Sequence, residues 1–566
     1  MPDSAAAPMP TAGLQARLAA VDALFAPFGR TDAPGCVVGI ALGGRAVYRK
    51  AFGLASVQHG VANTPRTRMR IGSTSKHFTC LAALLLAEEG RLDLDAPASV
   101  ALPDLTLPTL RGMPTLRQFM HHTSGWRCAL DLAMLGNGMA QMPTGWMPAA
   151  AARQQGVNFA PGTGQIYNNV GYHLLSMAID RAAGMPLEAF LRERVFVPLG
   201  MDDTEGIPSD HAVTPERASN HVPGPGGGWR HALMMTEEIR GEGNIVSTLD
   251  DMLRWLAHLR GAKRVGGDAT WAQMFEPATL PNGHRTLYAM GLMRNDYRGA
   301  EVIHHAGGVA GGNSDMLTVP AHQLDIALMT NGLPVAMRDL TPKIVDLLLA
   351  DQLGPEEPRA ELARFQHLVG TRYRGRSGLA IGFGAAGDRL GLSVMDNPPF
   401  EPLRVVGNEL QLGFERGAHS HLSLREADLA PQADGQAPAT LEIRDAGRAE
   451  HLVRLPETPP PALAAGAALL GHWVSHDLAA TAEIAAEGDA LVLRLRGDFS
   501  AQRVLRLTPW ADGVFAVGET TMPMLRLVLS RDDDGGPRAS RFCVDGLRTR
   551  RLAFVRATSD NERSTP

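Results

Sequence analysis

A repeat in the C-terminal part of the chain restricts the possible folds more than any other feature of the sequence. At a constant offset of 101 positions, the corresponding segments are 368–373 and 469–474, then 392–394 and 493–495, and finally Asn397 and Asp498. Both copies consist of short alternating apolar runs separated by Gly, Asp and Asn, a pattern typical of β-strands. Chance similarity between apolar runs is the alternative, but the constant offset favours a repeat. Two β-barrels of about 100 residues each are therefore expected.

Two proline-rich stretches delimit the copies of this repeat. Residues 353–358 combine proline with acidic residues, and residues 455–461 are rich in proline. At 566 residues, the chain is too long for a single hydrophobic core. We therefore expect a larger domain over residues 1–354, a β-barrel over 360–455 and a second β-barrel over 462–558.

Composition and charge exclude several classes of function. With 45% hydrophobic and 20% charged residues and a net charge of −5, the chain has the composition of a soluble globular protein without a nucleic-acid partner. No apolar run approaches the roughly 18 residues needed to cross a bilayer, so no membrane partner is expected. The first residues lack the basic and apolar regions of a signal peptide, which predicts a cytoplasmic protein, unless a signal has been trimmed.

The cysteines and histidines give no indication of a metal or another cofactor. The four cysteines are widely separated and lack metal-ligand spacing: Cys36, Cys80, Cys128 and Cys543. The histidine pairs at 121–122 and 304–305 are adjacent, and not four residues apart as two ligands on one helix face would be. We therefore expect neither a metal nor a cofactor.

Residues 1–354 combine helices with strands. Apolar periodicity predicts helices over 14–28, 73–89, 116–122, 167–183, 248–259 and 337–349. Apolar runs predict strands over 36–42, 45–48, 287–293, 301–305, 315–319 and 324–331. An antiparallel sheet with helices on its faces and a helical insertion between about 95 and 280 explains this order. The predicted fold class is α/β, in the α+β sense, followed by two antiparallel β-barrels.

A serine and a lysine stand three residues apart at the start of a predicted helix. Ser73 and Lys76 would share its first turn, with their side chains within reach of one another. A serine hydroxyl becomes a good nucleophile when a neighbouring base takes its proton, and lysine can be that base only if its pKa falls from about 10.4. Of 54 basic residues only four are lysines, and arginine could not replace a titratable amine. The alternative is an ordinary surface lysine.

A tyrosine and an asparagine lie at the start of a later predicted helix. Tyr167 is one of only six tyrosines, and Asn169 follows two residues later. A phenol beside the ammonium of Lys76 would have a lowered pKa and could relay protons. Asn169 would then orient Lys76 or the substrate carbonyl. The alternative is a half-buried core tyrosine whose hydroxyl bonds a carbonyl.

The third motif is a histidine followed by glycines. His305, Gly307 and Gly308 lie on a predicted strand, where a substrate backbone could approach closely. The N–H of Gly308 could complete an oxyanion hole with that of Ser73. When this motif is considered by itself, the alternative is a Gly-rich turn with a solvated histidine.

Together, the three motifs resemble those of the serine β-lactamase and penicillin-binding superfamily, of the class C and D-peptidase type. The resemblance covers about residues 11–350 and includes family-like stretches at 122–125, 198–201 and 247–250. It implies a β-lactamase-like catalytic domain that forms an acyl-enzyme on Ser73. It also implies that Lys76 and Tyr167 exchange protons, while the N–H groups of Ser73 and Gly308 hold the oxyanion.

The third motif departs from the Lys-Thr-Gly of β-lactamases and D-Ala carboxypeptidases. His305 would be mostly neutral at pH 7 and a weak partner for a substrate carboxylate. Amides, esters, or peptides bound from their other end are therefore favoured. His-x-Gly is also common among esterase-like relatives, so it narrows the class without fixing it.

The tail of two similar barrels resembles the D-stereospecific aminopeptidase branch of the superfamily. In that branch, a loop from the last barrel enters the active site, and an acidic residue on it holds the α-ammonium of the substrate. The matching loop here is 495–503, with Asp498 as the acidic residue. Residues 532–534 form a second candidate loop. The alternative is that Asp498 is a solvated residue of a hairpin without a role in binding. Phe499 would shorten the pocket and favour small residues such as D-Ala.

The hypothesis that follows is a serine aminopeptidase that releases N-terminal D-amino acids, D-Ala preferred, from peptides, amides or esters. Its partners would be a small peptide or amino-acid amide substrate, with β-lactams as inhibitors. An esterase or a weak β-lactamase or D-peptidase of the same fold is the alternative, and a non-catalytic binding protein is a third hypothesis. A homodimer is included among the hypotheses, although the sequence does not determine the oligomeric state.

Overall fold

The structure is a computed structural model that describes residues 11–138, 140–332, 337–395, 399–413, 422–499, 502–518, 527–532 and 535–558. Asn397 of the repeat and Asp533 and Asp534 of the second candidate loop lie outside the described residues.

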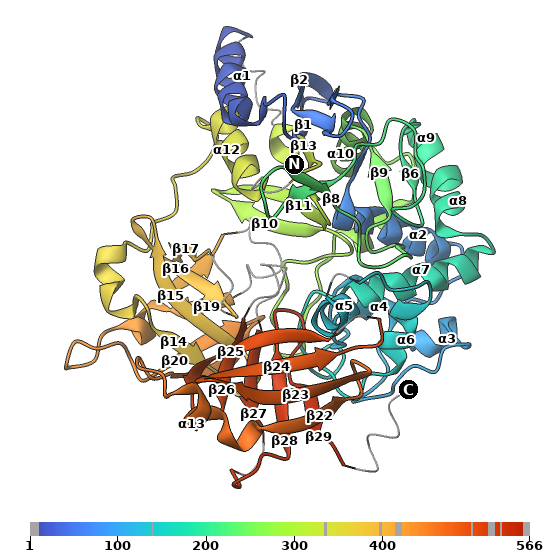
Figure 1. The fold of residues 1–566 in the computed structure, drawn as a ribbon. Helices are drawn as coiled ribbons and strands as arrows, with labels where there is room; N and C mark the ends of the chain where they lie inside the picture. Colours follow the sequence, from blue (N-terminus) through green and yellow to red (C-terminus); the bar gives the residue numbers. More distant parts are fainter. Residues whose placement is uncertain are drawn as a thin grey trace.

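A six-stranded antiparallel sheet forms the centre of the first domain (Figure 1). Its order is β10 (Met293–Tyr297), β11 (Ala300–Val309), β12 (Gly312–Val319), β13 (Leu324–Thr330), β1 (Cys36–Leu42) and β2 (Arg45–Phe52). The hairpin of β1 and β2 therefore pairs with strands almost 300 residues later in the sequence, since β1 pairs with β13. The predicted antiparallel sheet is confirmed.

One predicted strand is wrong in its position. A strand was expected over 287–293, but the observed strand β10 begins only at Met293. The chain turns at Gly291, which has a φ of +78°. A Cβ at Gly291 would lie 2.4 Å from the carbonyl oxygen of Lys76, so the turn is pressed against the start of the key helix. Apolar content predicted a strand here, but a contact distant in sequence imposes a turn.

Helices cover both faces of this sheet. On one face, α1 (Thr11–Phe25) and α12 (Met337–Leu349) pack over Val38 and Ile40, whose alternate neighbours Val37 and Ala41 face the other side. On that other side lies α10 (Leu249–Arg260), which the side chain of Thr248 caps at its N-terminus. Strand residues thus alternate between two separate apolar cores, as a two-residue period requires.

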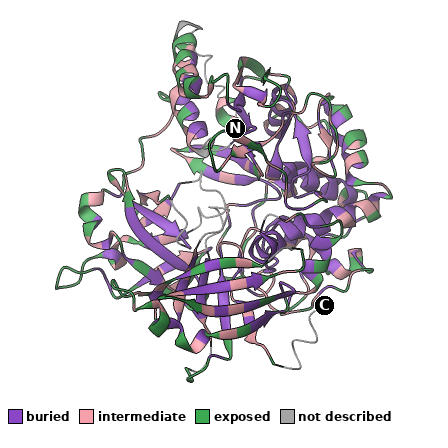
Figure 2. Ribbon diagram, viewed as in Figure 1, coloured by how far each residue is buried: buried purple, intermediate pink, exposed green. Residues whose placement is uncertain are grey.

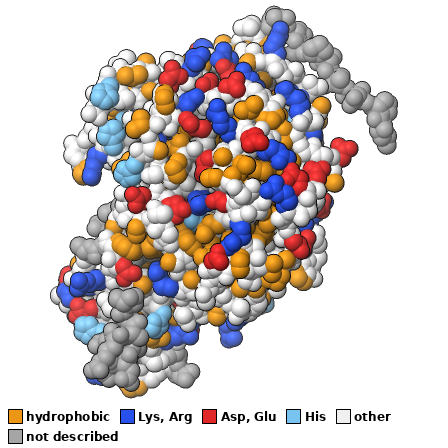
Figure 3. All heavy atoms as spheres, turned by 90° about the vertical axis from the view of Figure 1, so that its right-hand side faces the viewer, with side chains coloured by type: hydrophobic (Ala, Val, Ile, Leu, Met, Phe, Trp, Pro, Cys, Tyr) orange, Lys and Arg blue, Asp and Glu red, His pale blue; other side chains and the backbone are white. Residues whose placement is uncertain are grey.

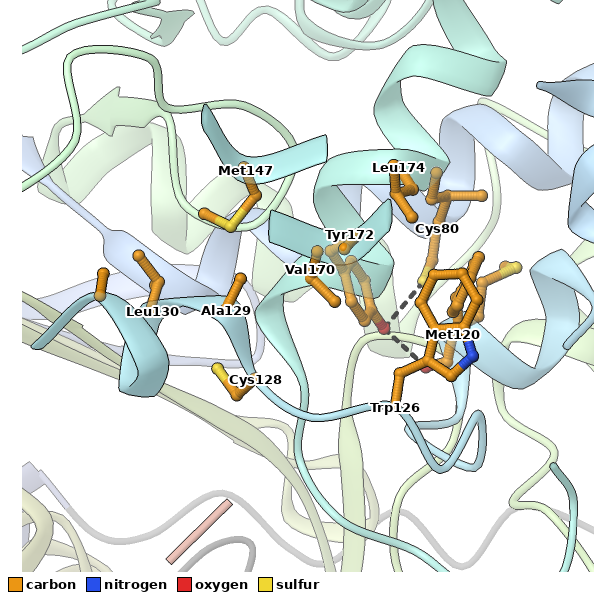
Figure 4. Packing of buried hydrophobic residues seen from close by; sticks show 14 of the residues in the cluster. Cys80, Met120, Trp126, Cys128, Ala129, Leu130, Met147, Val170, Tyr172 and Leu174 are labelled. Atoms are coloured by element: carbon orange, nitrogen blue, oxygen red, sulfur yellow. Dashed lines mark hydrogen bonds between the residues drawn. The ribbon is translucent and has the colours of Figure 1, made fainter. Parts of the chain in front are cut away.

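A group of helices packs around α2 (Lys76–Glu88) and α7 (Asn169–Ala183), and those between about residues 95 and 280 form the predicted insertion. The shorter helices are α3 (Ala98–Ala101), α4 (Leu116–Met120), α5 (Ala129–Asn137), α6 (Trp146–Ala152), α8 (Leu187–Leu191), α9 (Val197–Leu199) and α11 (Asp268–Met274). Short strands lie beside them: β3 (Leu54–Ser56), β4 (Val61–Ala62), β5 (Met69–Arg70), β6 (Glu205–Gly206), β7 (His221–Pro223), β8 (Trp229–His231) and β9 (Ile245–Ser247). Helix α2 is buried from Lys76 to Leu86. The Tyr172 hydroxyl donates to the carbonyl oxygen of Met120 at 2.6 Å and lies 3.3 Å from Sγ of Cys80 (Figure 4).

Two closed barrels of eight antiparallel strands follow (Figure 1). The first contains β14 (Arg372–Arg374), β15 (Ala380–Ala386), β16 (Arg389–Val394), β17 (Glu401–Val406), β18 (Glu409–Leu412), β19 (Leu422–Arg425), β20 (Thr440–Asp445) and β21 (Arg448–Arg454). After α13 (Ala462–Gly466), the second contains β22 (Gly471–Ser475), β23 (Ala480–Glu487), β24 (Ala490–Arg496), β25 (Arg503–Ala511), β26 (Val514–Gly518), β27 (Leu527–Arg531), β28 (Arg541–Asp545) and β29 (Leu552–Arg556). The predicted repeat is confirmed, since β16 and β24, and likewise β20 and β28, start 101 positions apart.

Burial follows this architecture (Figure 2). Buried residues occupy the sheet, α2, α7 and the barrel interiors, while barrel strands alternate between buried and exposed positions, as in the pattern of β23. On the face shown in Figure 3, acidic and basic side chains are interspersed. Among the described residues, every helix is too short or too polar to span a bilayer.

Candidate active site

Ser73 lies in a short 3-10 turn, Gly72–Ser75, directly before α2. The turn is pressed against β11: Gly72 has a φ of +52°, and a Cβ there would lie 2.9 Å from the backbone nitrogen of Gly308. The hydroxyl of Thr74 donates to the carbonyl oxygen of His305 at 3.2 Å. Ser73 and Lys76 were expected in the first turn of one helix. Instead, Ser73 lies in a 3-10 turn, and Lys76 begins the helix that follows it. Ser73 itself is partly exposed.

Lys76 is fully buried beneath this serine. Its Nζ lies 3.1 Å from Oγ of Ser73 and donates to Oδ1 of Asn169 at 2.8 Å and to the carbonyl oxygen of Glu242 at 2.7 Å. The pKa of Lys76 is lowered to about 7, mainly by burial; the charge of Glu242 opposes this shift and the charge of Arg548 contributes to it. The pKa of Lys76 is therefore shifted in the direction that a lysine base requires.

Tyr167 stands just outside α7, which begins at Asn169 because the side chain of Asn168 caps it. The Tyr167 ring centre lies 5.0 Å from Nζ of Lys76 and 4.0 Å from the imidazole centre of His122. Burial raises the pKa of Tyr167, so the expected lowering by Lys76 is wrong. The contact between the Tyr167 and Ser73 hydroxyls is too poor in geometry to count as a hydrogen bond, yet it offsets part of the rise. The phenol is therefore neutral and can donate a proton.

His305 lies on β11 and is only 4% exposed, so the solvated-turn alternative is wrong. Its Nδ1 bonds the carbonyl oxygen of Ala306 at 2.6 Å and must carry the proton, which leaves Nε2 to accept from the hydroxyl of Tyr288 at 2.9 Å. Burial lowers the pKa of His305 well below its usual value. The histidine is neutral, as expected, and provides no positive charge.

The glycines of the third motif bring β11 against the serine turn. A Cβ at Gly307 would lie 1.9 Å from the carbonyl oxygen of Ile71, so no other residue fits without moving the backbone. That same oxygen accepts from the hydroxyl of Ser314 at 2.7 Å. Gly308 lies against Gly72, as described above. The two backbone segments that flank Ser73 are therefore held together without intervening side chains.

Asp498 follows β24, and its loop contacts α5. The backbone nitrogen of Phe499 donates to Oδ1 of Asn137 at 3.0 Å, and Phe499 is 40% exposed. Burial raises the pKa of Asp498, while the charge of Arg153 counteracts it. Within the described part of the chain, no hydrogen bond or ion pair joins Asp498 to the serine, lysine or tyrosine. The structure thus brings Ser73, Lys76, Tyr167 and Asn169 together, with His305, Gly307 and Gly308 alongside, but not Asp498.

Another loop of the second barrel reaches Tyr167 instead. Three residues of the loop 546–551, between β28 and β29, line a pocket together with that tyrosine: Leu547, Arg548 and Arg550. Its lining residues are Gln165, Ile166, Tyr167, Leu379, Val394, Leu422, Asp445, Leu547, Arg548 and Arg550. Sequence reasoning missed this loop, together with Glu242 and Tyr288. The one available signal was the density of arginine in this part of the predicted second barrel, at Arg548, Arg550 and Arg551.

Known proteins resemble this chain in sequence and in fold. Residues 21–350 match the family model described as Beta-lactamase. The chain is 28% identical over 368 residues to a D-aminopeptidase of Gluconobacter oxydans, a match covering 64% of this chain and 66% of that protein. It is 30% identical over 286 residues to a D-aminopeptidase of Brucella ovis, covering 49% and 52%. The chain thus spans between about half and two thirds of the length of these curated relatives.

One solved structure shares the fold over most of the chain. The octameric penicillin-binding protein homologue from Pyrococcus abyssi has a TM-score of 0.52 and 19% identity, covering 88% of this chain and 100% of that one. At this identity the likeness concerns the fold alone.

Proposed function

We propose, from the premise that this chain belongs to the beta-lactamase family, that it is a serine hydrolase that releases N-terminal D-amino acids from peptides, amides or esters. The observation that carries the proposal is a buried lysine with a pKa of about 7 whose Nζ lies 3.1 Å from Oγ of Ser73. A neutral amine at that distance is a competent base at neutral pH. The D-amino acid specificity is supported by the relatives named D-aminopeptidase.

The proposed acylation uses three groups: the hydroxyl of Ser73, the amine of Lys76 and the hydroxyl of Tyr167. Neutral Lys76 takes the proton of the Ser73 hydroxyl, and Oγ forms a bond to the carbonyl carbon of the substrate. Tyr167, neutral because its pKa is raised, gives its proton to the leaving nitrogen as the C–N bond breaks. Lys76 then returns a proton to Tyr167. Water completes the cycle by the reverse transfers, which free the D-amino acid and restore Ser73.

The neighbours of these groups would fix their geometry. Oδ1 of Asn169 accepts from Nζ of Lys76 and holds it toward Ser73. The N–H groups of Ser73 and Gly308 would stabilise the oxyanion, which is supported by the close approach of their backbone segments. Neutral His305, fixed by Tyr288, would wall the site without attracting a carboxylate.

Asp498 remains the proposed partner of the substrate ammonium, and D-Ala the proposed preferred residue. Support is limited to the carboxylate's place on a loop of the second barrel that packs on α5. An Asp498→Asn variant would raise KM for amine-bearing substrates while sparing N-acetylated esters. Equal effects on both substrate types would remove Asp498 from the proposal.

An esterase is the second candidate function. The observation that favours it is His305, a neutral group where a lysine would otherwise attract a carboxylate. The remaining proposals are inhibition by β-lactams, a homodimer, a cytoplasmic location in keeping with the four free cysteines, and a division into domains at 1–354, 360–455 and 462–558. Sedimentation checks the homodimer, fractionation checks the location, and limited proteolysis checks the division into domains.

The decisive experiment is a screen of D- and L-aminoacyl p-nitroanilides with the wild type and Ser73→Ala. We expect turnover of D-substrates by the wild type, a covalent acyl adduct on Ser73 by mass spectrometry, and neither with the variant. A preference for L-substrates or undiminished activity of Ser73→Ala contradicts the proposal. Turnover of esters alone supports the esterase.

A further inference from the structure

The loop between β28 and β29 presents a cation in the same pocket as Tyr167. Nε of Arg548 donates to Oδ1 of Asp131 at 2.9 Å, and Nη2 donates to the same oxygen. For Nη1, no partner is found among the described residues, and the side chain is 25% exposed. Although burial acts to lower the pKa of Arg548, Asp131 outweighs it, so the guanidinium stays charged. The pocket therefore contains an arginine with an available donor.

The loop is held so that this arginine is preorganised. Asn158 donates from Nδ2 to the carbonyl oxygen of Arg548 at 3.1 Å and accepts from the backbone nitrogen of Arg550 at 2.8 Å. Arg127 donates to the carbonyl oxygens of Arg550 at 3.0 Å and Arg551 at 2.8 Å. Arg127 is in turn paired with buried Asp477. Catalytic-domain side chains thus fix both ends of the short segment that carries Arg548.

Resting on the proposed function, we propose that Arg548 binds the carboxylate of the leaving residue, so that the substrate class is dipeptides with an N-terminal D-amino acid. Tyr167 would protonate the leaving nitrogen. In a dipeptide, the carboxylate oxygens lie within roughly 4 Å of that nitrogen, since only Cα separates the two groups. A cation lining the same pocket as Tyr167 is therefore within reach of this carboxylate.

The other groups in the pocket agree with this assignment. Leu379 and Leu422 from the first barrel and Leu547 from the loop provide apolar walls for the side chain of the leaving residue. The remaining charged groups are Asp445 and Arg550, and Arg550 bonds the carbonyl oxygen of Gly546. Because His305 is neutral, Arg548 supplies the positive charge that the third motif lacks. In a longer peptide, a neutral carbonyl would replace the carboxylate and bind less tightly.

The test compares D-Ala-Leu with D-Ala-Leu amide in the wild type, Arg548→Gln, Arg548→Lys and Arg503→Gln. The loss of kcat/KM in Arg548→Gln should be about 10- to 100-fold greater for the dipeptide than for its amide. Arg548→Lys should recover part of that ratio. Arg503, whose guanidinium holds the other loop on α5 through the carbonyl oxygens of Met134 and Leu135, is the matched control. Its variant should affect both substrates in equal proportion.

Product inhibition provides a measurement that needs no variant. Free leucine should inhibit the wild type more strongly than leucine amide, assayed with D-Ala p-nitroanilide. Equal inhibition by the two, or equal losses on dipeptide and amide in Arg548→Gln, overturns the assignment of Arg548. Failure of the wild type to hydrolyse D-Ala p-nitroanilide at all contradicts the proposed function instead.

Discussion

The two barrels repeat one pattern of strands but are joined to the rest of the molecule in different ways. Apolar residues inside the first barrel form a cluster of their own, which includes Trp510 and Val528 of the second barrel and packs against Val514, Ala516 and Leu547. Those inside the second barrel are continuous with the core of α2, α5 and α7. At the pocket, the first barrel contributes Asp445 and three apolar side chains, whereas the second contributes Leu547 and the two arginines Arg548 and Arg550. Duplicated folds can therefore take separate roles through their outer contacts alone.

Removing the second barrel should have the largest effect. A chain that ends before residue 460 would expose the apolar side chains of α5, such as Leu132 and Leu135, which share a core with that barrel. We expect loss of both solubility and activity, measured by the soluble fraction and by turnover of D-Ala p-nitroanilide. A folded, active fragment with unchanged selectivity would show that the second barrel adds only stability.

Breaking the contact between the second barrel and the helical insertion should have the next largest effect. Arg127→Ala leaves buried Asp477 without its ion-pair partner, which costs about 3–5 kcal/mol of unfolding free energy. The matched change at the first barrel is Asn282→Ala, which removes one 3.3 Å bond to the carbonyl oxygen of Ala446. It should cost about 1 kcal/mol. Urea titration measures both, and equal losses would contradict the difference between the barrels.

Two leucines at equivalent positions of the repeat make the comparison sharper. Leu493 and Leu392 are both buried, in the second and the first barrel respectively. Replacing either by alanine should cost about 2–5 kcal/mol. Only Leu493→Ala should lower the temperature at which activity is lost, because its cluster includes the helices around the site. If Leu392→Ala lowers that temperature equally, the two cores are one cooperative unit.

The smallest expected effect is electrostatic. Activity requires neutral Lys76, so kcat/KM should rise with pH through about 7. Arg548 lowers the pKa of Lys76, so Arg548→Gln should move this limb of the pH profile to higher pH. Arg404→Gln in the first barrel, where Arg404 pairs with Glu357, should leave the limb in place. If this limb does not move in Arg548→Gln, Arg548 does not lower the pKa of Lys76.

The sequence predicted those parts of the molecule that depend on neighbours along the chain. Ser73 and Lys76 could be paired because three residues on a turn place them together, and the repeat could be found because strand spacing persists. The pKa of Tyr167 was predicted with the wrong sign, since His122 and other distant residues bury it. Arg548 was missed because alternation identifies strands but does not determine which loop of a barrel faces another domain.

The continuity between the second barrel and the insertion also has a consequence for synthesis of the protein. Translation proceeds from the N-terminus, so α5 emerges well before Leu493 and the other residues that complete its core. The first barrel, made in between, has its own cluster and can fold while α5 is still waiting. During that interval the nascent chain presents an apolar surface that chaperones can bind. Because of the order of the domains along the chain, the helices that support Ser73 must wait for the second barrel before their apolar core is complete.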